Sequence, residues 1–499
     1  MAIASVKLHV ALEILGSCYP NRVMFRFYLK LQALRYLIEE ATGAEETLLP
    51  VLPQLLTEYF RIMNEIGNDE VVAALQTIID KFGDHLEPHS VALVTQLSNA
   101  FKNYVEVGDD DDDAAMAAAQ CLECISTVLK GICERPDLYR HLEPNLVPLV
   151  MQVLGSDGEF IEYLEYALDI LTFLTFFPDT ISPQLWECFP LIYTAFDQYA
   201  FDYLNLMVIP VDNFIAKDPQ YFLAAVNSDG AKYIDLVFSM VAKTLGEDRS
   251  SELECRKSLS LLMSVLLHCK GHIDAYLPLI NDITLAKLGQ QVKSENPLTR
   301  IVCFQVLGSA LWYNPLLELQ ELEKRAVTQE VFSQWIQDSE KMEKWLPRKL
   351  SVLGLASVML LPTSSLPHTI SSSLPQLLAA AVQITERMKE DAEGHEEEGE
   401  GEDCHIEEEE EEDDECEDEG FGEDEDVTDD AHVAYVQALS KLNRGGNDIS
   451  KFLVGEDWDQ DDDDDDEDYT SPIDEVDQLL FLSDALKVAF QREPEVRKE

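Results

Sequence analysis

Apolar residues recur along most of the chain with the period of an α-helix. One stretch follows the i, i+3, i+4, i+7, i+8, i+11 pattern of a single helix face, at Leu52, Leu55, Leu56, Tyr59, Phe60 and Met63. After the break at Gly67-Asn68, a second stretch repeats it, at Val72, Leu75, Ile78, Ile79 and Phe82. Alternation of apolar and polar residues is nowhere sustained long enough to predict a sheet. The sequence therefore predicts an all-α protein built from helix pairs.

The predicted helices begin in a similar way at several places. The run Leu-Pro-Gln-Leu-Leu at residues 52–56 recurs at residues 374–378, and related starts contain Pro88, Pro144, Pro183 and Pro278. Proline suits the first turn of a helix because the N–H that it lacks has no partner there. Pro183 and Pro278 are 95 residues apart, and Pro278 and Pro375 are 97 residues apart. Both spacings are near twice a HEAT unit of ~40–47 residues. We expect a HEAT-repeat superhelical solenoid over residues 29–389, with a concave binding surface.

The negative charge is concentrated near the C-terminus. The whole chain carries a formal net charge of −60, from 96 acidic and 36 basic residues. Residues 390–477 contain 42 of those acidic residues and only three basic ones. Such a segment cannot bury its carboxylates, so we expect a long disordered acidic insertion over 390–470, with a short amphipathic helix at 431–443.

Helical periodicity returns after the insertion. We expect a C-terminal amphipathic helix over 471–492, capped by Ser471 with Pro472 in its first turn, and then a tail at 493–499. The apolar face of this helix is predicted at Val476, Leu479, Leu480, Ser483, Leu486 and Phe490. The first 28 residues match no pattern that assigns them to the solenoid.

The charge also restricts the partners. A polyanion repels nucleic acids and anionic membranes and attracts basic proteins, so we expect no direct binding to either. The ten cysteines lack the spacing of a disulfide framework, and the longest apolar stretches are too short to span a bilayer. These features predict a protein of the cytoplasm or the nucleus.

Two acidic blocks predict a polyanionic clamp for cargo rich in lysine and arginine, acting by long-range attraction that weakens as salt rises. Trp458, with Phe421 and Tyr469, adds aromatic contacts to cationic side chains. The predicted clamp residues are Glu407, Glu408, Glu409, Glu410, Glu411, Glu412, Asp413, Asp414, Trp458, Asp461, Asp462, Asp463, Asp464, Asp465 and Asp466. The alternative interpretation is a loop that only improves solubility.

Catalytic and metal sites find no support in the sequence. Cys121 and Cys124 form a Cys-x-x-Cys pair, but no second pair accompanies them, so buried or surface thiols are favoured over zinc ligands. Cys404, His405 and Cys416 lie among carboxylates without metal-ligand spacing. No phosphate-binding glycine loop, dinucleotide fingerprint or nucleophile elbow is present. We expect no enzyme activity, no cofactor and no metal.

A collinear series of short segments resembles the C-terminal half of the importin-β (karyopherin-β) family, most closely its importin-7/importin-8 branch. The resemblance covers roughly residues 31–490. It is carried by Ser182-Pro183-Gln184, Trp186, Pro190-Leu191, Phe201-Asp202-Tyr203, Cys269-Lys270-Gly271, Ile273-Asp274, Pro278, Ala310-Leu311, Tyr313-Asn314-Pro315, Gln334-Trp335, Arg348-Lys349, Val352-Leu353-Gly354-Leu355, and Pro472 with Asp474-Glu475 after the acidic insertion.

The resemblance implies a nuclear transport receptor, found in the cytoplasm, the nucleus and the nuclear pore of the nuclear envelope. Its implied partners are basic cargo such as ribosomal proteins and histones, phenylalanine-glycine nucleoporins, Ran-GTP, which releases the cargo, and importin-β itself. The N-terminal half, where the family makes its principal Ran contact, has no counterpart here, so we expect a fragment that lacks that half. Two alternatives remain open: an acidic chaperone that shields basic proteins without transport, and a HEAT scaffold like a phosphatase subunit.

Overall fold

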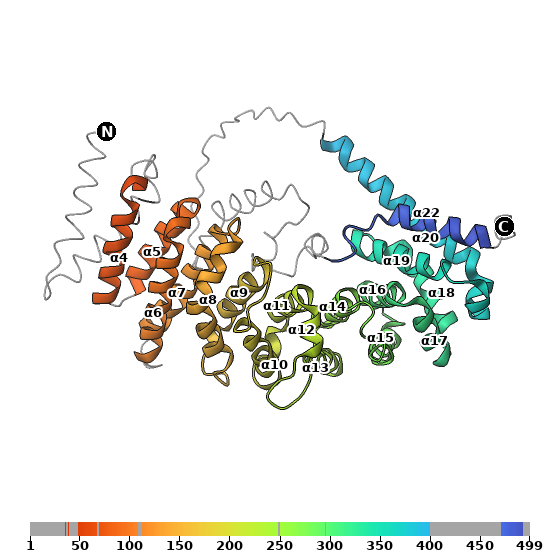
Figure 1. The fold of residues 1–499 in the computed structure, drawn as a ribbon, viewed down its shortest axis with the longest axis horizontal. Coiled ribbons are helices and arrows are strands. Elements are labelled where there is room, and N and C mark those ends of the chain that lie inside the picture. The colour runs from red at the N-terminus through yellow and green to blue at the C-terminus, as the bar shows by residue number, and fades with distance from the viewer. Residues whose placement is uncertain are drawn as a thin grey trace, which may run out of the picture. The chain divides into compact units, whose positions relative to one another are not determined.

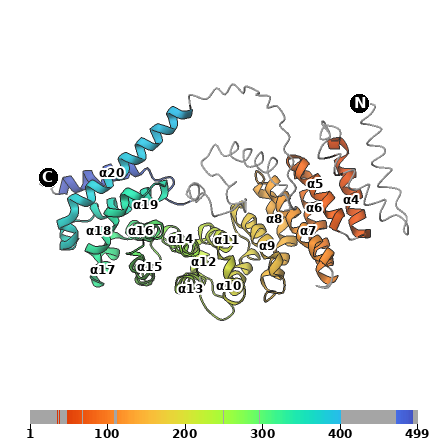
Figure 2. The ribbon, with the colours of Figure 1, turned by 180° about the vertical axis from the view of Figure 1, so that it is seen from behind.

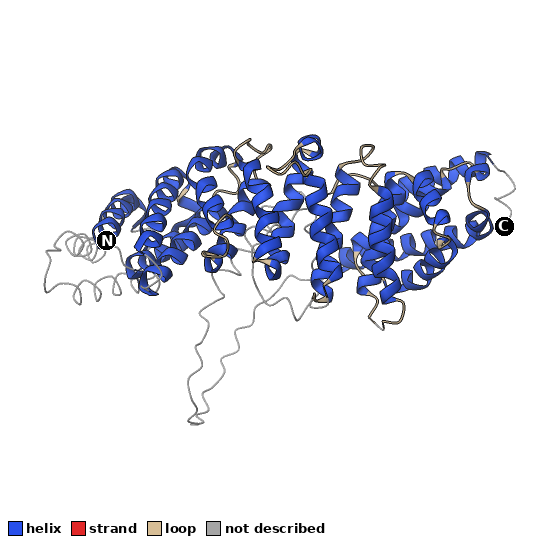
Figure 3. Ribbon diagram, turned by 90° about the horizontal axis from the view of Figure 1, so that it is seen from below, coloured by secondary structure: helices blue, strands red, loops and turns tan. Residues whose placement is uncertain are grey.

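The computed structural model describes residues 48–66, 69–107, 112–247, 250–294, 296–399 and 471–492, together with Arg35 and Ile38. Throughout these ranges the regular structure is helical, apart from one isolated bridge between Val226 and Lys232 (Figure 3). The chain divides into two compact units, Met1–Ser264 and Val265–Glu499, with the boundary inside helix α14 (Glu252–His268). None of the described helices is long and apolar enough to cross a membrane.

The first unit consists of two layers of helices (Figure 1). One layer, the A helices, contains α4 (Leu52–Ile66), α6 (Ser90–Val107), α8 (Pro136–Leu154), α10 (Cys188–Gln198) and α13 (Tyr233–Gly246). The other, the B helices, contains α5 (Asp69–Phe82), α7 (Asp112–Gly131), α9 (Leu164–Phe176) and α11 (Leu204–Lys217), after which comes the short α12 (Pro219–Ala224). Helices α6, α8, α10 and α13 pack in succession, as do α5, α7, α9 and α11. Each repeat thus buries its apolar faces against its neighbours.

The second unit repeats this plan with some irregularity. Its helices are α15 (Leu277–Gln291), α16 (Leu298–Tyr313), α17 (Pro315–Lys324), α18 (Thr328–Asp338), α19 (Trp345–Met359), α20 (His368–Gly399) and α22 (Gln478–Arg492). Helices α16 and α19 pack closely and form the B layer of this unit, whereas α15, α17 and α18 belong to its A layer. Figures 1 and 2 show α15 and α17 on one side of this B layer.

The repeat length confirms the all-α, HEAT-type prediction for the described part of the chain. The A helices of the first unit begin at Leu52, Ser90, Pro136, Cys188 and Tyr233, at intervals of 38 to 52 residues. These intervals lie around the HEAT period of ~40–47 residues and above the 34 residues of a tetratricopeptide repeat. The predicted helices at residues 52 and 72 are α4 and α5.

Proline identified some helix starts correctly and others wrongly. Pro53 and Pro278 do lie at the second position of α4 and α15. Pro144 and Pro375, however, lie inside α8 and α20. Helix α8 begins at Pro136, where a proline again takes the first position. An internal proline removes one hydrogen bond of the helix ladder, and burial of the surrounding apolar residues compensates for that loss.

Glycine allows α16 and α19 to approach closely. A Cβ atom added to Gly354 would lie 2.9 Å from the Cα atom of Gly308 and 3.0 Å from its carbonyl oxygen. A Cβ atom on Gly308 would lie 2.9 Å from the carbonyl oxygen of Leu350. The indole of Trp335 packs beside this crossing and donates a hydrogen bond from Nε1 to Ser351 Oγ at 3.0 Å. The helix backbones are therefore in direct contact here.

The C-terminal boundaries differ from those expected. Helix α20 continues to Gly399, ten residues beyond the predicted end of the solenoid at 389. The last helix begins at Gln478 rather than at Ser471. The predicted N-terminal segment 1–28, residues 400–470 of the predicted insertion 390–470, including the short helix at 431–443, and the tail at 493–499 lie outside the described residues.

Candidate functional site

The predicted acidic clamp lies outside the part of the chain that the structure describes. This holds for its first block, Glu407–Asp414, for Trp458 and for its second block, Asp461–Asp466, as well as for Phe421 and Tyr469. The structure does describe the points at which the chain leaves the second unit and returns to it. The chain leaves at the end of α20 and returns at residue 471. We call residues 471–492 the C-terminal arm.

Helix α20 is fastened to its neighbours by polar contacts. Arg348 of α19 forms an ion pair with Asp391 and donates a hydrogen bond from Nε to the carbonyl oxygen of Met342 at 2.6 Å. Arg387 donates to the carbonyl oxygen of Glu340 at 3.1 Å. Helix α20 is therefore tied, as far as Asp391, to α19 and to the segment that precedes α19.

The arm begins with a tight turn. The Ser471 N–H donates to the Asp474 carboxylate Oδ2 at 2.6 Å, and the Ile473 N–H donates to Ser471 Oγ at 3.4 Å. The turn inserts Ile473 into the core with no solvent exposure. Asp477 then caps α22, because its Oδ1 accepts a hydrogen bond from the Leu480 N–H at 2.9 Å. The prediction that Ser471 caps the helix is thus wrong: Ser471 and Asp474 stabilise the turn instead.

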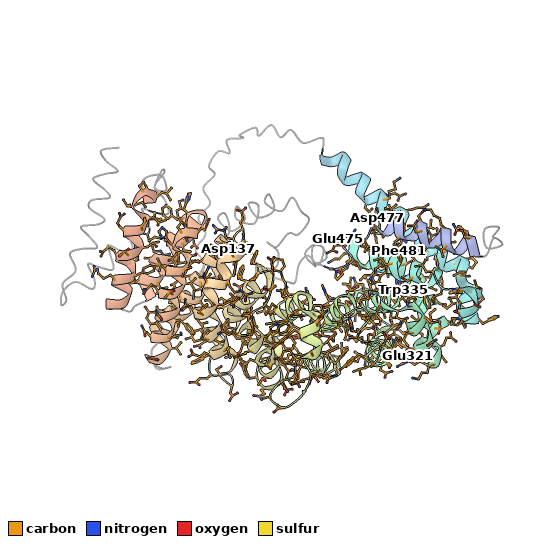
Figure 4. All side chains as sticks on the ribbon, in the orientation of Figure 1. Asp137, Glu321, Trp335, Glu475, Asp477 and Phe481 are labelled. Atoms are coloured by element: carbon orange, nitrogen blue, oxygen red, sulfur yellow. The ribbon has the colours of Figure 1, made fainter. Side chains whose placement is uncertain are left out.

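Lys349 of α19 is buried beneath this turn. Its side chain is 2% exposed, its Nζ donates to the carbonyl oxygen of Asp474 at 3.2 Å, and it lies 4.3 Å from the ring centroid of Trp345. Burial lowers the pKa of Lys349, and the carboxylates of Asp474 and Asp477 offset part of that effect. Figure 4 shows Glu475, Asp477 and Phe481 on the side of the unit opposite Glu321 of α17.

The apolar face of α22 is not the predicted one. Leu479 and Leu480 are 45% and 65% exposed, whereas Leu482 and Ala485 are buried. Phe481 packs edge-on against Trp312 of α16, with ring centroids 4.9 Å apart. The contacts of the turn at 471–477 determine which side of α22 faces the core. Periodicity alone does not contain this information, so the predicted face includes residues that are exposed.

A group of acidic residues on the B helices of the first unit escaped the sequence analysis. It consists of Asp80 on α5, Glu123 on α7, and Glu165 and Asp169 on α9, and we call it the carboxylate row. Asp80, Glu123 and Glu165 are exposed and Asp169 is half-buried. The row crosses three successive B helices, so the repeat itself brings these carboxylates to one face.

The electrostatics of the row favour a cationic partner. Desolvation by the surrounding helices raises the pKa of Asp80 to about 6. The hydrogen bond from Gln76 offsets part of this rise, as do the charges of Lys130 and Arg35, whereas the charge of Glu123 adds to it. Burial also raises the pKa of Glu123 and of Asp169, although Lys130 offsets part of the effect in both. Surrounding helices thus displace water from carboxylates that still reach the surface. A lysine- or arginine-rich segment could replace that lost solvation.

The candidate metal ligands that the structure describes are not arranged to hold an ion. Cys121 and Cys124 are both buried in α7, and burial raises the pKa of both thiols. Within the described residues, no three histidine, cysteine or acidic side chains form a metal-binding group. Cys404, His405 and Cys416 lie outside those residues.

Comparison with known proteins assigns this architecture to a family. A family model described as importin-11-like, TPR repeats, matches residues 138–436, well over half of the chain. The chain belongs to the importin-β family. Within that family it falls on the importin-7/importin-8 branch, as its relatives indicate.

Three relatives illustrate the similarity. An importin beta-like SAD2 homolog of Arabidopsis thaliana is 32% identical over 375 residues, which is 72% of this chain and 36% of the relative. A probable importin-7 homolog of Dictyostelium discoideum is 29% identical over 70% of this chain and 32% of its own length. Human importin-8 is 27% identical over 69% of this chain and 33% of its own length. This importin-family chain thus spans about a third of the length of the relatives that it matches.

Proposed function

We propose that this importin-family chain takes part in nuclear import by binding basic cargo, such as ribosomal proteins and histones. Membership of the importin-β family carries the proposal. The two acidic blocks and the carboxylate row supply charge of the sign that such cargo requires. Binding is spread over many side chains of stacked helices, and we propose no enzymatic role, metal or cofactor.

The proposed cycle places the protein in the cytoplasm, the nucleus and the nuclear pore. Ran-GTP displaces the cargo, phenylalanine-glycine nucleoporins bind the helical repeats, and importin-β serves as a further partner. The names of the relatives, which include importin-7 and importin-8, support this assignment.

Binding of purified chain to linker histone and to ribosomal proteins, with and without Ran-GTP, tests the proposal. We expect salt-sensitive binding that Ran-GTP reduces. Binding that ignores Ran-GTP would favour the second candidate, an acidic chaperone that shields basic proteins, which the two acidic blocks also support. Absence of binding at low salt would refute both.

Charge-neutralising variants separate the two acidic surfaces. One variant replaces Glu407–Glu412 with glutamine and Asp461–Asp466 with asparagine, and a second carries Glu123→Gln with Asp169→Asn. The matched control carries Glu162→Gln and Glu187→Gln, which remove two exposed charges of the same unit outside the row. We expect each test variant to weaken cargo binding at least tenfold and the control to change it less than twofold. Equal effects of the second variant and the control, which remove two charges each, would mean that only net charge matters on this unit.

A further inference from the structure

The C-terminal arm covers the B layer of the second unit instead of completing another regular helix pair. Helix α22 packs much more extensively against α19 than against α20, the preceding helix of the described residues. Figures 1 and 2 both show α22 on the side of α16 and α19 that faces away from α15 and α17. The arm is therefore a third layer on a face that the B helices would otherwise expose.

The first requirement of this face is an oxygen acceptor. Lys349 is buried, and its printed hydrogen bond goes to the carbonyl oxygen of Asp474 in the arm. The carboxylates of Asp474 and Asp477 act on the same ammonium group. Removal of the arm without a replacement would expose Lys349 to water and leave the cation without these partners.

The second requirement is an aromatic or apolar side chain. Phe481 packs edge-on against Trp312, and Lys270 lies 3.8 Å from the centroid of the same indole ring. Leu482 and Ala485, also on α22, are buried, and α22 packs against α19. An occupant of this face therefore needs acidic residues in a turn and an aromatic residue about one helical turn after the helix begins.

We propose that the face formed by α16 and α19 is a docking surface for an acidic amphipathic helix of a partner protein, with the arm as its resident competitor. The charge of the required ligand is opposite to that of basic cargo, so this inference goes beyond the proposed function and does not depend on it. The arm is held to the face by non-covalent contacts and is covalently joined to α20 only through residues 400–470. A partner segment with the same pattern can thus exchange with it while the repeats stay folded.

A labelled synthetic peptide of residues 471–492 serves as the probe. In the full-length chain, Leu482→Asp places a charge in the buried contact and releases the resident arm. The matched control is Leu480→Asp, which makes the same change two residues away on the exposed side of α22. We expect the peptide to bind the Leu482→Asp chain at least tenfold more tightly than either the wild-type or the Leu480→Asp chain.

Peptide variants test the two requirements of the face. Asp474→Asn with Asp477→Asn should weaken binding to the Leu482→Asp chain at least fivefold, and Phe481→Ala should do the same. Lys349→Met in that chain should remove the preference for the acidic peptide over the asparagine peptide. Equal peptide binding to the Leu482→Asp and Leu480→Asp chains, or no binding to either, would overturn the proposal.

Hydrogen exchange of the wild-type chain provides a second test that needs no arm-release variant. We expect the amides of α22 to exchange through an opening that leaves α16 and α19 protected, because exchange of the arm must not require unfolding of the face. Added peptide should then keep the amides of α16 and α19 protected from exchange, while the amides of the displaced α22 exchange faster. Loss of protection in all three helices at one common rate would mean that the arm is an inseparable part of the core.

Discussion

Replacement of Gly354 by alanine tests whether the stability of the second unit depends on the close backbone contact between α16 and α19. The added methyl group would lie 2.9 Å from the Cα atom and 3.0 Å from the carbonyl oxygen of Gly308. Both atoms belong to a helix backbone, which cannot rotate away as a flexible side chain can. The two helices must therefore move apart, and the packing of Trp335 beside the crossing must change with them.

Two opposing effects set the expected magnitude. Extra volume in a tightly packed core costs ~1–3 kcal/mol, with the upper part of that range expected where the obstacle is backbone. Alanine in place of glycine stabilises a helix by ~0.5–1 kcal/mol. We expect Gly354→Ala to lower the free energy of unfolding of this unit by about 2 kcal/mol.

The matched control is Gly289→Ala on α15. An added Cβ atom there meets no atom within 4 Å, so only the gain in helix propensity remains. This variant should therefore stabilise the unit by ~0.5 kcal/mol, with the opposite sign. Hydrogen exchange of α16 and α19, together with urea unfolding followed by circular dichroism, measures both changes.

The double variant Gly308→Ala/Gly354→Ala sharpens the test. Once one methyl group has separated the helices, the second enters space that is already open, so the two losses should sum to more than the loss in the double variant. A Gly354→Ala chain as stable as the wild type would refute the argument, because it would show that the crossing can expand without cost.

Three further predictions concern ionisable groups. Burial raises the pKa of Glu318 to about 7, above the 4.5 of an exposed glutamate. Between pH 4.5 and 7 the folded state therefore binds this proton more tightly than the unfolded state, so the free energy of unfolding should fall as the pH rises through that range. Glu318→Gln should remove this pH dependence and raise the free energy of unfolding by up to ~3 kcal/mol at about pH 8, as measured by urea titration. Although burial alone would raise it, hydrogen bonds led by that of Arg300 lower the pKa of Asp338 from 3.8 to about 2, so the stability that this carboxylate contributes should be complete above pH 3.8 and be lost as the pH falls from there to about 2. Asp338→Asn leaves Arg300 buried without its carboxylate and should cost ~3–5 kcal/mol in thermal or urea unfolding, whereas an unchanged midpoint would contradict this. Because the pKa of Asp80 is raised to about 6, basic cargo should bind more weakly at pH 5.5 than at pH 7.5, and Asp80→Asn should reduce that difference in a fluorescence-anisotropy assay.

The sequence predicted the elements better than their contacts. The apolar period at residues 52–63 and 72–82 located α4 and α5, because burial on both sides of a repeat requires a continuous apolar face. The same method failed for α22, whose apolar residues surround much of the helix. There the preceding turn determines which face is buried, and Leu479 and Leu480 remain exposed.

The candidate sites depended on contacts between distant residues. Asp80, Glu123 and Asp169 are separated by 43 and 46 residues, about one repeat each, and that spacing was the available signal for the carboxylate row. Surface acids are so common in this chain that the signal could not be distinguished from background. The burial of Lys349 was equally hidden, since its partner in the arm is 125 residues away.

This long separation has a consequence for folding during synthesis. Other hydrogen bonds between repeats join residues about one repeat apart, such as Asn213 with Thr175 at 38 residues and Arg325 with Asp282 at 43. The stacked helices can thus assemble in order as the ribosome releases them, whereas the Lys349 contact must wait until residue 474 has emerged. The entropic cost of closing a loop grows only slowly with the length of the loop. The insertion therefore delays docking of the C-terminal arm far more than it destabilises the folded second unit. A nascent chain stalled within the acidic segment would consequently present folded repeats whose α16 and α19 face is still uncovered.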